Sequence, residues 1–221
     1  MQILNILDND QLKHAQNLLT KINFRDGKKT AKGLAKDVKN NTEASKMGEE
    51  YEEISKYLYK ILVESSWLKR RYAPKRFSNL IINKYSVGEN YGRHYDSSHM
   101  ITKSGSLRSD LSFTLMLSNS SDYEGGELEI EAGNQTHKVT LDAGHMVIYP
   151  SIYMHAVLPV IKGKRIACVG WFSSHIKDYF ARETLNAYED MHLSLLKYDL
   201  SEDDQLKLSY MQNRIRHLLS D

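Results

Sequence analysis

A histidine and an aspartate stand two residues apart in the stretch YGRHYDSSHM, at positions 94 and 96. The chain holds nine histidines, and a His-x-Asp triplet is expected by chance about half a time at this composition, so the triplet alone proves little. It follows a strand-like run, and in an extended backbone residues i and i+2 point to the same side. The imidazole of His94 and the carboxylate of Asp96 would then share one metal ion, while Tyr95 would face away.

The candidate for a third ligand is His155. It begins the return of the chain after a strand-like run that ends in a turn at Pro150 and Ser151. Two histidines and one carboxylate on one face of a metal leave three positions open, and this arrangement suits non-haem Fe(II) oxygen chemistry.

An arginine that could bind an anion follows His155 by ten residues, at Arg165 in the run KRIACVGWF. This spacing alone is expected by chance about 0.4 times, but the joint pattern in the expected elements is much rarer. An anionic cosubstrate that chelates the metal needs its far carboxylate neutralised, and a buried arginine does this with two charge-assisted hydrogen bonds. Tyr85, on the strand-like run before the triplet, could add a hydroxyl to that carboxylate.

The elements that must position these residues are short strands. Strand-like runs separated by tight turns, without intervening helices, predict an antiparallel sandwich or jelly roll over residues 77–172. The dipeptide GN at 133–134 is a hairpin signal between two of these runs. The runs are FSNLIINKYSVG, LSFTLMLS, GELEIEA, QTHKVTL, HMVIYPS and RIACVGWF.

Helices are predicted on both sides of this core. Residues 1–76 form an N-terminal helical region that packs on the core, in which Asn9 or Asp10 caps the first helix and residues 25–45 form an ordered polar loop or extended arm. Residues 175–221 form a C-terminal helical extension with a Ser201…Asp204 capping pattern. Its expected apolar stripe consists of Leu208, Met211, Ile215 and Leu218. The predicted fold class is therefore α+β, a mainly β core with helical flanks, built as a double-stranded β-helix or jelly roll over residues 77–174.

Composition sets further limits. A chain of 221 residues, 41% of them hydrophobic, suits one domain, or one domain with an extension. A net charge of +2 demands no nucleic-acid partner. The N-terminus acquires acids and amides too early for a signal peptide, and no run approaches the roughly 18 apolar residues of a membrane span. The single Cys168 excludes an internal disulfide and is expected to be a buried thiol. The sequence predicts a cytoplasmic protein without a membrane partner.

Together, these motifs resemble the iron(II)- and 2-oxoglutarate-dependent dioxygenases of the prolyl 4-hydroxylase superfamily, and most closely the bacterial PKHD-type hydroxylases. The likeness runs in family order over nearly the whole chain. It is carried by NKYSVGENYGRHYD, LRSDLSFTLMLS, DYEGGELEIE, AGHMVIYPSIYMHAVLPVIKGKR and the tryptophan at 171.

The resemblance implies site residues. His94, Asp96 and His155 would be the iron ligands, Arg165 the 2-oxoglutarate anchor and Tyr85 the family's tyrosine before the His-x-Asp motif. The pair Gly125–Gly126 fits a turn into a strand that packs near the cosubstrate. The chain departs from the family at His145, where an acidic residue is common, and this histidine is not expected to be a ligand. Further residues expected to line the pocket are Tyr91, Thr114, Leu128, Trp171 and His99.

The implied reaction couples oxidative decarboxylation of 2-oxoglutarate to hydroxylation of a C–H bond, with Fe(II), O2 and, as reductant, L-ascorbate. The family name suggests a prolyl residue in a peptide or protein as the substrate. The basic cluster at 69–76 and the polar loop at 25–45 could frame an open groove for such a chain.

Other functions stay open on the sequence. A small metabolite or a nucleic acid could be the substrate, although nucleic-acid dealkylases of this fold usually carry a second arginine six residues beyond the anchor, where this chain has Trp171. A cupin-like metal-binding domain typically draws on a His-x-His pair, which this chain lacks. A non-catalytic interaction domain would not need all four key residues. A dimer is compatible with the sequence, which does not determine the oligomeric state.

Overall fold

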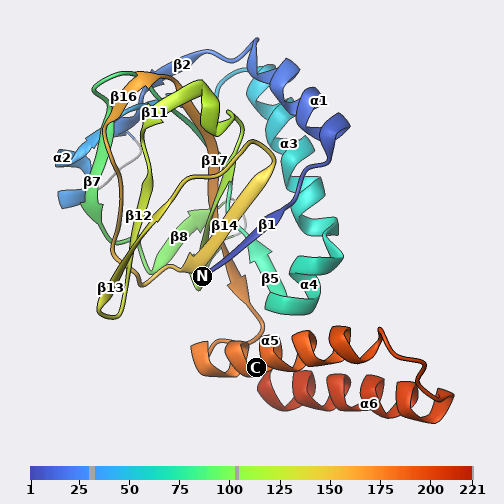
Figure 1. The fold of residues 1–221 in the computed structure, drawn as a ribbon. Coiled ribbons are helices and arrows are strands. Elements are labelled where there is room, and N and C mark those ends of the chain that lie inside the picture. Colours follow the sequence, from blue (N-terminus) through green and yellow to red (C-terminus); the bar gives the residue numbers. More distant parts are fainter. Residues whose placement is uncertain (30–32, 103–104, 221) are drawn as a thin grey trace. The chain divides into compact units, whose positions relative to one another are not determined.

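The structure is a computed structural model that describes residues 1–29, 33–102 and 105–220. Residues 30–32, in the predicted polar loop, lie outside the described residues. The chain divides into two compact units, one of residues 1–64 and 77–172, the other of residues 65–76 and 173–221. Figure 1 shows the strands of the first unit and the helices of both. The predicted division at residues 76 and 174 stays a prediction.

The larger sheet of the first unit is antiparallel and carries the predicted cosubstrate residues. Its strands lie in the order β1 (Gln2–Asn5), β14 (His145–Pro150), β10 (Leu111–Met116), β17 (Arg165–Ser174), β6 (Ile81–Tyr85), β4 (Thr42–Ala44) and β2 (Phe24–Asp26). Every residue of β10 is buried, as expected for a central strand covered on both faces. Arg165 of β17 pairs directly with Tyr85 of β6, so the two residues point to the same face of the sheet.

The smaller sheet carries the predicted metal ligands. Its order is β13 (Gln135–Val139), β12 (Leu128–Ala132), β15 (His155–Val157), β7 (Asn90–His94) and β3 (Lys39–Asn40). The predicted hairpin at 133–134 joins β12 to β13, with Gly133 at a positive φ of 62°. Two further two-stranded sheets pair β8 (His99–Thr102) with β9 (Gly105–Arg108), and β11 (Tyr123–Gly125) with β16 (Val160–Gly163). A 3-10 turn, η2 (Ser120–Asp122), precedes β11.

A buried apolar core lies between the two sheets, and this arrangement confirms the predicted jelly roll with helical flanks. The core draws on residues of both sheets, among them Tyr85, Leu128, Ile130, Val147, Val157 and Ala167. Cys168 is fully buried, as expected.

Two long helices of the first unit pack together, α1 (Asn9–Leu19) and α3 (Glu49–Glu64). α3 buries an apolar face that includes Ile54, Leu58 and Leu62, and its Tyr51 hydroxyl donates a hydrogen bond to the carbonyl of Leu80. The cap of α1 is Asp8, not Asn9 or Asp10 as predicted. Asp8 has an extended backbone, and its carboxylate accepts from the backbone nitrogen of Gln11 at 2.8 Å.

The segment predicted as a polar loop or arm at 25–45 is built into both sheets. It contributes β2 and β4 to the larger sheet and β3 to the smaller one, with η1 (Gly27–Lys29) and α2 (Leu34–Asp37) between them. Lys39, Asn41 and Glu43 of this segment are buried, so burial here does not follow the polarity of the residues. The segment therefore links the two sheets that carry the site.

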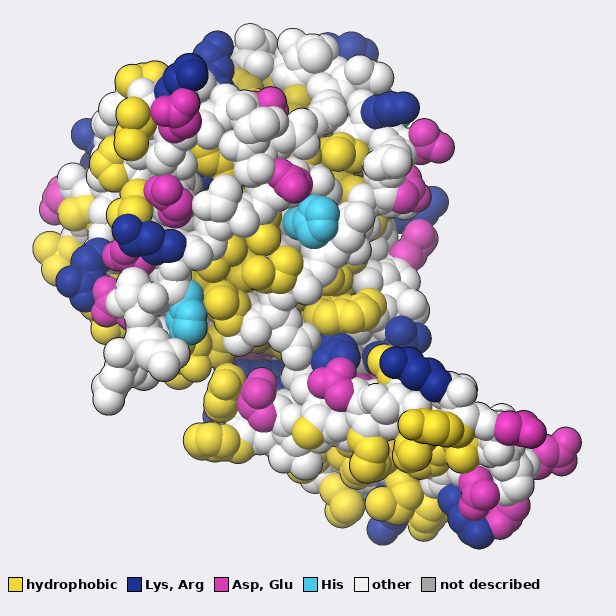
Figure 2. Space-filling model, in the orientation of Figure 1, with side chains coloured by type: hydrophobic (Ala, Val, Ile, Leu, Met, Phe, Trp, Pro, Cys, Tyr) yellow, Lys and Arg dark blue, Asp and Glu magenta, His cyan; other side chains and the backbone are white. Residues whose placement is uncertain are grey.

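The second unit contains α4 (Ser66–Tyr72), α5 (Tyr179–Leu195) and α6 (Glu202–Leu219), with β5 (Pro74–Phe77) at its boundary. The Ser201 hydroxyl caps α6 by accepting from the nitrogen of Asp204, as predicted. Arg71 of the basic cluster at 69–76 pairs with Asp190. In the expected apolar stripe of α6, Met211 and Leu218 are exposed. Figure 2 shows hydrophobic side chains (yellow) on the surface of the helices α5 and α6. Among the described residues, no helix combines the length and apolar character needed to cross a membrane.

Candidate metal and cosubstrate site

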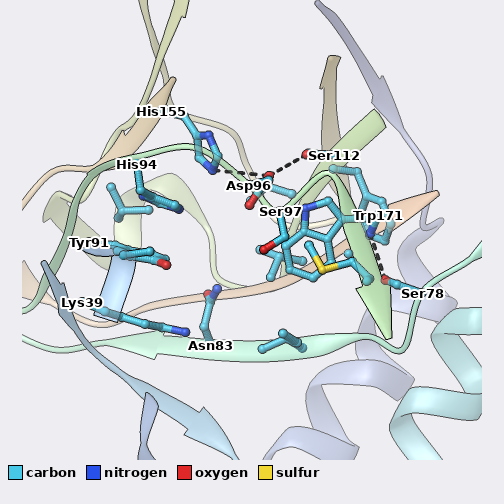
Figure 3. Close-up of a pocket in the computed structure, with 18 of the residues that line it drawn as sticks. Lys39, Ser78, Asn83, Tyr91, His94, Asp96, Ser97, Ser112, His155 and Trp171 are labelled. Carbon is cyan, nitrogen blue, oxygen red and sulfur yellow. Dashed lines mark hydrogen bonds and ion pairs between the residues drawn. The ribbon is translucent and has the colours of Figure 1, made fainter. Parts of the chain in front are cut away.

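The pairing of β7 with β15 brings the predicted metal ligands together. His94, the last residue of β7, lies directly opposite His155, the first residue of β15. Asp96 follows β7 by two residues, and the potential ligand atoms of the three side chains lie within 4.8 Å of one another. The Nε2 atom of His155 is 3.6 Å from Oδ2 of Asp96. Figure 3 shows the three side chains converging on one side of the cavity.

Backbone carbonyls orient both imidazoles. Nδ1 of His94 lies 2.8 Å from the carbonyl oxygen of Gly92, and Nδ1 of His155 lies 3.0 Å from that of Tyr153. A carbonyl only accepts, so Nδ1 carries the proton in each ring and the lone pair stays on Nε2. This is the arrangement in which a histidine ligates a metal through Nε2 with its other nitrogen held in place.

Two serines hold the carboxylate of Asp96. The Ser112 hydroxyl donates to Oδ2 of Asp96 at 2.6 Å, and the Ser151 hydroxyl lies 2.8 Å from the Ser112 oxygen. Ser151 belongs to the predicted turn after β14, which the nitrogen of Tyr153 closes by donating to the carbonyl of Pro150. The turn that positions His155 therefore also helps to orient Asp96.

His94 is suited to bind a metal at neutral pH. Burial, followed by the neighbouring His155, lowers the pKa of His94 to about 4. Because burial disfavours the charged ring, His94 stays neutral at pH 7 and offers a lone pair. The Tyr91 ring stacks on the His94 ring with 3.6 Å between centroids and an angle of 16°.

Arg165 is buried at 2% exposure in the same cavity. Its Nε and Nη1 atoms have no hydrogen-bond partner among the described residues, and the Tyr123 side chain lies close to its guanidinium. Gly126 lies beside it, and a Cβ added there would be 3.1 Å from Cδ of Arg165, at a φ of 66° that favours glycine. Buried donors of this kind are costly unless an acceptor reaches them, and the far carboxylate of 2-oxoglutarate fits that need.

Tyr85 lies against the same guanidinium, which is 5.5 Å from the centre of its ring. Burial raises the pKa of Tyr85 to about 12, with the nearby Arg165 opposing the shift. The phenol therefore stays protonated at neutral pH and can donate to a carboxylate.

One cavity of about 360 Å³ contains both groups of residues. All five residues predicted to line the pocket do so, and His99 stands exposed at its rim. His99 is not part of the close cluster of potential ligand atoms. His145, where the chain departs from the family pattern, begins β14 and does not line the cavity.

Several polar residues of the cavity wall were not predicted from the sequence. Asn83 is buried, and its Oδ1 has no partner among the described residues. It precedes Tyr85 by two residues on β6, so the period of two along a strand would have found it. Ser112 could have been found in the same way from Thr114. Lys39 and Glu43 also line the cavity, and no signal in their polar segment pointed to them.

Comparison with known proteins agrees with this geometry. Residues 80–173 match the model of the 2OG-Fe(II) oxygenase superfamily. A PKHD-type hydroxylase of Idiomarina loihiensis is 42% identical over 185 residues, which cover 84% of this chain and 82% of the relative. A PKHD-type hydroxylase of Prochlorococcus marinus is 35% identical over 218 residues, which cover 98% of this chain and 96% of the relative.

Solved structures share the fold at lower identity. A prolyl hydroxylase from Trichoplax adhaerens, in complex with a hypoxia inducible factor peptide fragment, gives a TM-score of 0.57 at 18% identity, covering 77% of this chain and 82% of its own. The viral collagen prolyl hydroxylase of Paramecium Bursaria Chlorella virus-1, in complex with 2OG, gives a TM-score of 0.52 at 19% identity. The match covers 78% of this chain and 95% of the viral chain. The sequence relatives show the family: this chain is a PKHD-type hydroxylase, a dioxygenase of the 2-oxoglutarate- and Fe(II)-dependent oxygenase superfamily, whose members use Fe(II), 2-oxoglutarate and O2.

Proposed function

We propose that the cavity hydroxylates a prolyl residue in a peptide or protein, with His94, Asp96 and His155 as Fe(II) ligands and Arg165 and Tyr85 as the anchor of 2-oxoglutarate. The observation that carries this proposal is the joint occurrence, in one cavity, of an oriented His-Asp-His cluster and a buried arginine with unpartnered donors. Two neutral histidines and a carboxylate are the donor set of non-haem Fe(II) oxygenases.

When bound, the metal supplies the activation of O2 and the oxidation of a C–H bond. The protein's part is orientation and exclusion of water. Arg165 presents charge-assisted donors to the 5-carboxylate of 2-oxoglutarate, and the Tyr85 hydroxyl adds a neutral one. Leu128 and Val157 are apolar parts of the wall that keep water from the reacting atoms.

The net charge of the loaded cavity favours a substrate group that is itself uncharged. Asp96 and Arg165 carry opposite charges, Fe(II) and dianionic 2-oxoglutarate cancel, and the buried Lys39 is paired with Glu43. The loaded interior therefore has no net charge, and Lys46 lies at the exposed rim. A neutral prolyl ring enters such a site without the desolvation cost that a phosphate would meet.

The rim offers contacts to a chain longer than one residue. Tyr95 and Ile101 line the cavity and are 60% and 79% exposed. Exposed apolar side chains around a pocket are typical of surfaces that bind a partner. Two similar structures are named as prolyl hydroxylases, one of them in complex with a peptide, and this supports a peptide as the substrate here.

The test is oxygenation of defined candidate substrates by the 221-residue chain with Fe(II), 2-oxoglutarate and L-ascorbate, the proposed reductant. Proline-containing peptides, free L-proline and a single-stranded oligonucleotide are compared, and succinate and product mass are measured. We expect peptide to raise succinate formation above the background without substrate and to gain one oxygen on proline. The His155→Ala variant serves as the inactive control.

Oxygen found only on the free amino acid, or only on the oligonucleotide, would overturn the prolyl-peptide assignment and leave the oxygenase chemistry in place. Omitting ascorbate should shorten the period of turnover without changing the identity of the product, since a reductant restores metal oxidised in unproductive cycles.

A further inference from the structure

A buried ion pair in the cavity wall has no place in the chemistry described so far. Lys39 and Glu43 form a salt bridge, and the two residues are 5% and 3% exposed. Removing two charges from water costs several kcal/mol per ion before their attraction repays it. The pair adds nothing to the net charge of the cavity, so its position needs another explanation.

The ammonium group of Lys39 lies against an aromatic ring. Lys39 of β3 pairs with Tyr91 of β7, and Nζ of Lys39 is 5.2 Å from the centre of the Tyr91 ring. A cation near an aromatic ring is attracted by the quadrupole of the ring, and more strongly when both are desolvated. The carboxylate of Glu43 pairs with the same ammonium.

The Tyr91 ring in turn lies on His94. Their centroids are 3.6 Å apart and their planes differ by 16°. Figure 3 shows Lys39, Tyr91 and His94 one above another along one wall of the cavity. Stacking therefore restrains the plane of the imidazole, while the Gly92 carbonyl restrains its rotation through Nδ1.

The backbone of the same segment also supports β7. The nitrogen of Gly92 donates to the carbonyl of Val38 at 2.8 Å, and a Cβ at position 92 would lie 2.8 Å from Cβ of Val38. Only glycine allows this approach without a shift of the segment. Residues 38–43 thus contact β7 both through the backbone and through the Tyr91 ring.

We propose that Lys39, held by Glu43, is a positioning residue that keeps the Tyr91 ring stacked on His94 and so fixes the orientation of one metal ligand. The proposal rests on the metal assignment made under the proposed function. Outer groups that orient a metal ligand typically change metal affinity 10–100-fold when they are removed. Lys39 acts through Tyr91, so the effects of the two residues must not add.

The test is Co(II) binding to the metal-free 221-residue chain, followed through the visible absorption bands of the bound ion. We expect Lys39→Met and Tyr91→Leu each to raise the Co(II) dissociation constant about tenfold and to alter the band shape. The double variant should bind no more weakly than the weaker single variant. Lys39→Arg keeps the charge, and Tyr91→Phe keeps the ring, so both should stay within about twofold of wild type.

The matched control is Lys84→Met. Nζ of Lys84 lies 4.3 Å from the centre of the Phe24 ring, and neither residue lines the cavity. Its Co(II) affinity and spectrum should equal those of wild type. Lys39→Met/Glu43→Leu, which leaves no unpaired buried charge, provides a folded alternative if Lys39→Met unfolds.

Three results would overturn the proposal. One is an unchanged dissociation constant and spectrum in folded variants that lack Lys39, which would make the ion pair purely structural. Another is additive effects of Lys39→Met and Tyr91→Leu, which would separate the two residues. The third is wild-type protein that binds no Co(II), and this result alone would also remove the metal assignment.

Discussion

At one end of the cavity each proposed metal ligand has a hydrogen bond to the protein, whereas at the other end two donor nitrogens of the arginine have none among the described residues. We call His94, Asp96 and His155 the metal end, and Arg165 with Tyr85 the anchor end. Carbonyls and a serine hold the metal end. At the anchor end, Nε and Nη1 of Arg165 have no partner among the described residues.

The difference lies in what surrounds the side chains, because both ends are placed at strand ends. The metal end lies where β7 ends and β15 begins, and each imidazole there bonds to the carbonyl of the residue two positions before it. The anchor end lies where β6 ends and β17 begins, with Tyr85 and Arg165 paired across the ladder, and no acceptor among the described residues reaches Nε or Nη1 of Arg165. The metal end is therefore oriented by the fold itself, while the anchor end depends on its ligand to satisfy its donors.

The largest effect should come from removing a ligand. In His94→Ala, Asp96→Ala or His155→Ala we expect Fe(II) affinity to fall by more than about 100-fold. This loss exceeds the roughly 10- to 100-fold loss caused by removing a residue that only orients a ligand. Far-UV circular dichroism should stay that of wild type, because the side chain lost is one of many in the core. The measurement is anaerobic Fe(II) titration against a competing chelator. Wild-type affinity in any one variant would show that this residue is not a ligand.

The next effect separates the two ends. Arg165→Lys keeps the charge but loses the planar fork, so the KM for 2-oxoglutarate should rise about 10- to 100-fold, the value of one charge-assisted hydrogen bond. The dissociation constant for Fe(II) should change less than about twofold, because no ligand is bonded to Arg165. Succinate formation against 2-oxoglutarate concentration measures the first, and the Fe(II) titration measures the second. An unaltered KM for 2-oxoglutarate would mean that a residue other than Arg165 binds its 5-carboxylate.

A smaller effect tests whether the metal end is oriented in advance. Ser112→Ala removes the donor at 2.6 Å from Asp96, and Fe(II) affinity should fall about tenfold. Ser118→Ala is the matched control, since its buried hydroxyl accepts from the nitrogen of Ile166 away from the cavity. It should lower stability but not Fe(II) affinity. Equal affinities in the two serine variants would mean that Asp96 is held by the backbone alone.

Much of this architecture could be read from residue types and spacing. The strands, the hairpin at 133–134 and the spacing of His94, Asp96 and His155 follow local rules, because strand residues alternate and turns need particular residues. That β7 pairs with β15, and so brings the ligands together, is a long-range pairing that local patterns do not determine.

The segment at 25–45 shows why other parts were missed. Lys39, Asn41 and Glu43 are polar, so the sequence suggested exposure, yet all three are buried. Charged residues are almost never buried unless they are paired, and the pairing of Lys39 with Glu43 exists only once the segment is folded. The stripe on α6 was predicted from helical spacing, and spacing does not determine burial: Met211 and Leu218 are exposed in the structure.

The smallest expected effect tests the anchor end without its ligand. Arg165→Met replaces a guanidinium that has two unpartnered nitrogens by an unbranched apolar side chain of similar length. The variant loses the contact with Tyr123, but it no longer buries a charge. In the absence of 2-oxoglutarate we therefore expect the free energy of unfolding to stay equal or to rise by about 1 kcal/mol. Urea unfolding of the apoprotein measures this.

With 2-oxoglutarate and Co(II), wild type should gain stability as ligand concentration rises, because a ligand that binds only the folded state stabilises it. Arg165→Met should lose the share of that gain that depends on 2-oxoglutarate and keep the share that depends on Co(II). A loss of more than about 2 kcal/mol in the ligand-free variant would match removal of a satisfied buried group. Arg165 would then be held by the fold, like the metal ligands, and the contrast between the two ends would disappear.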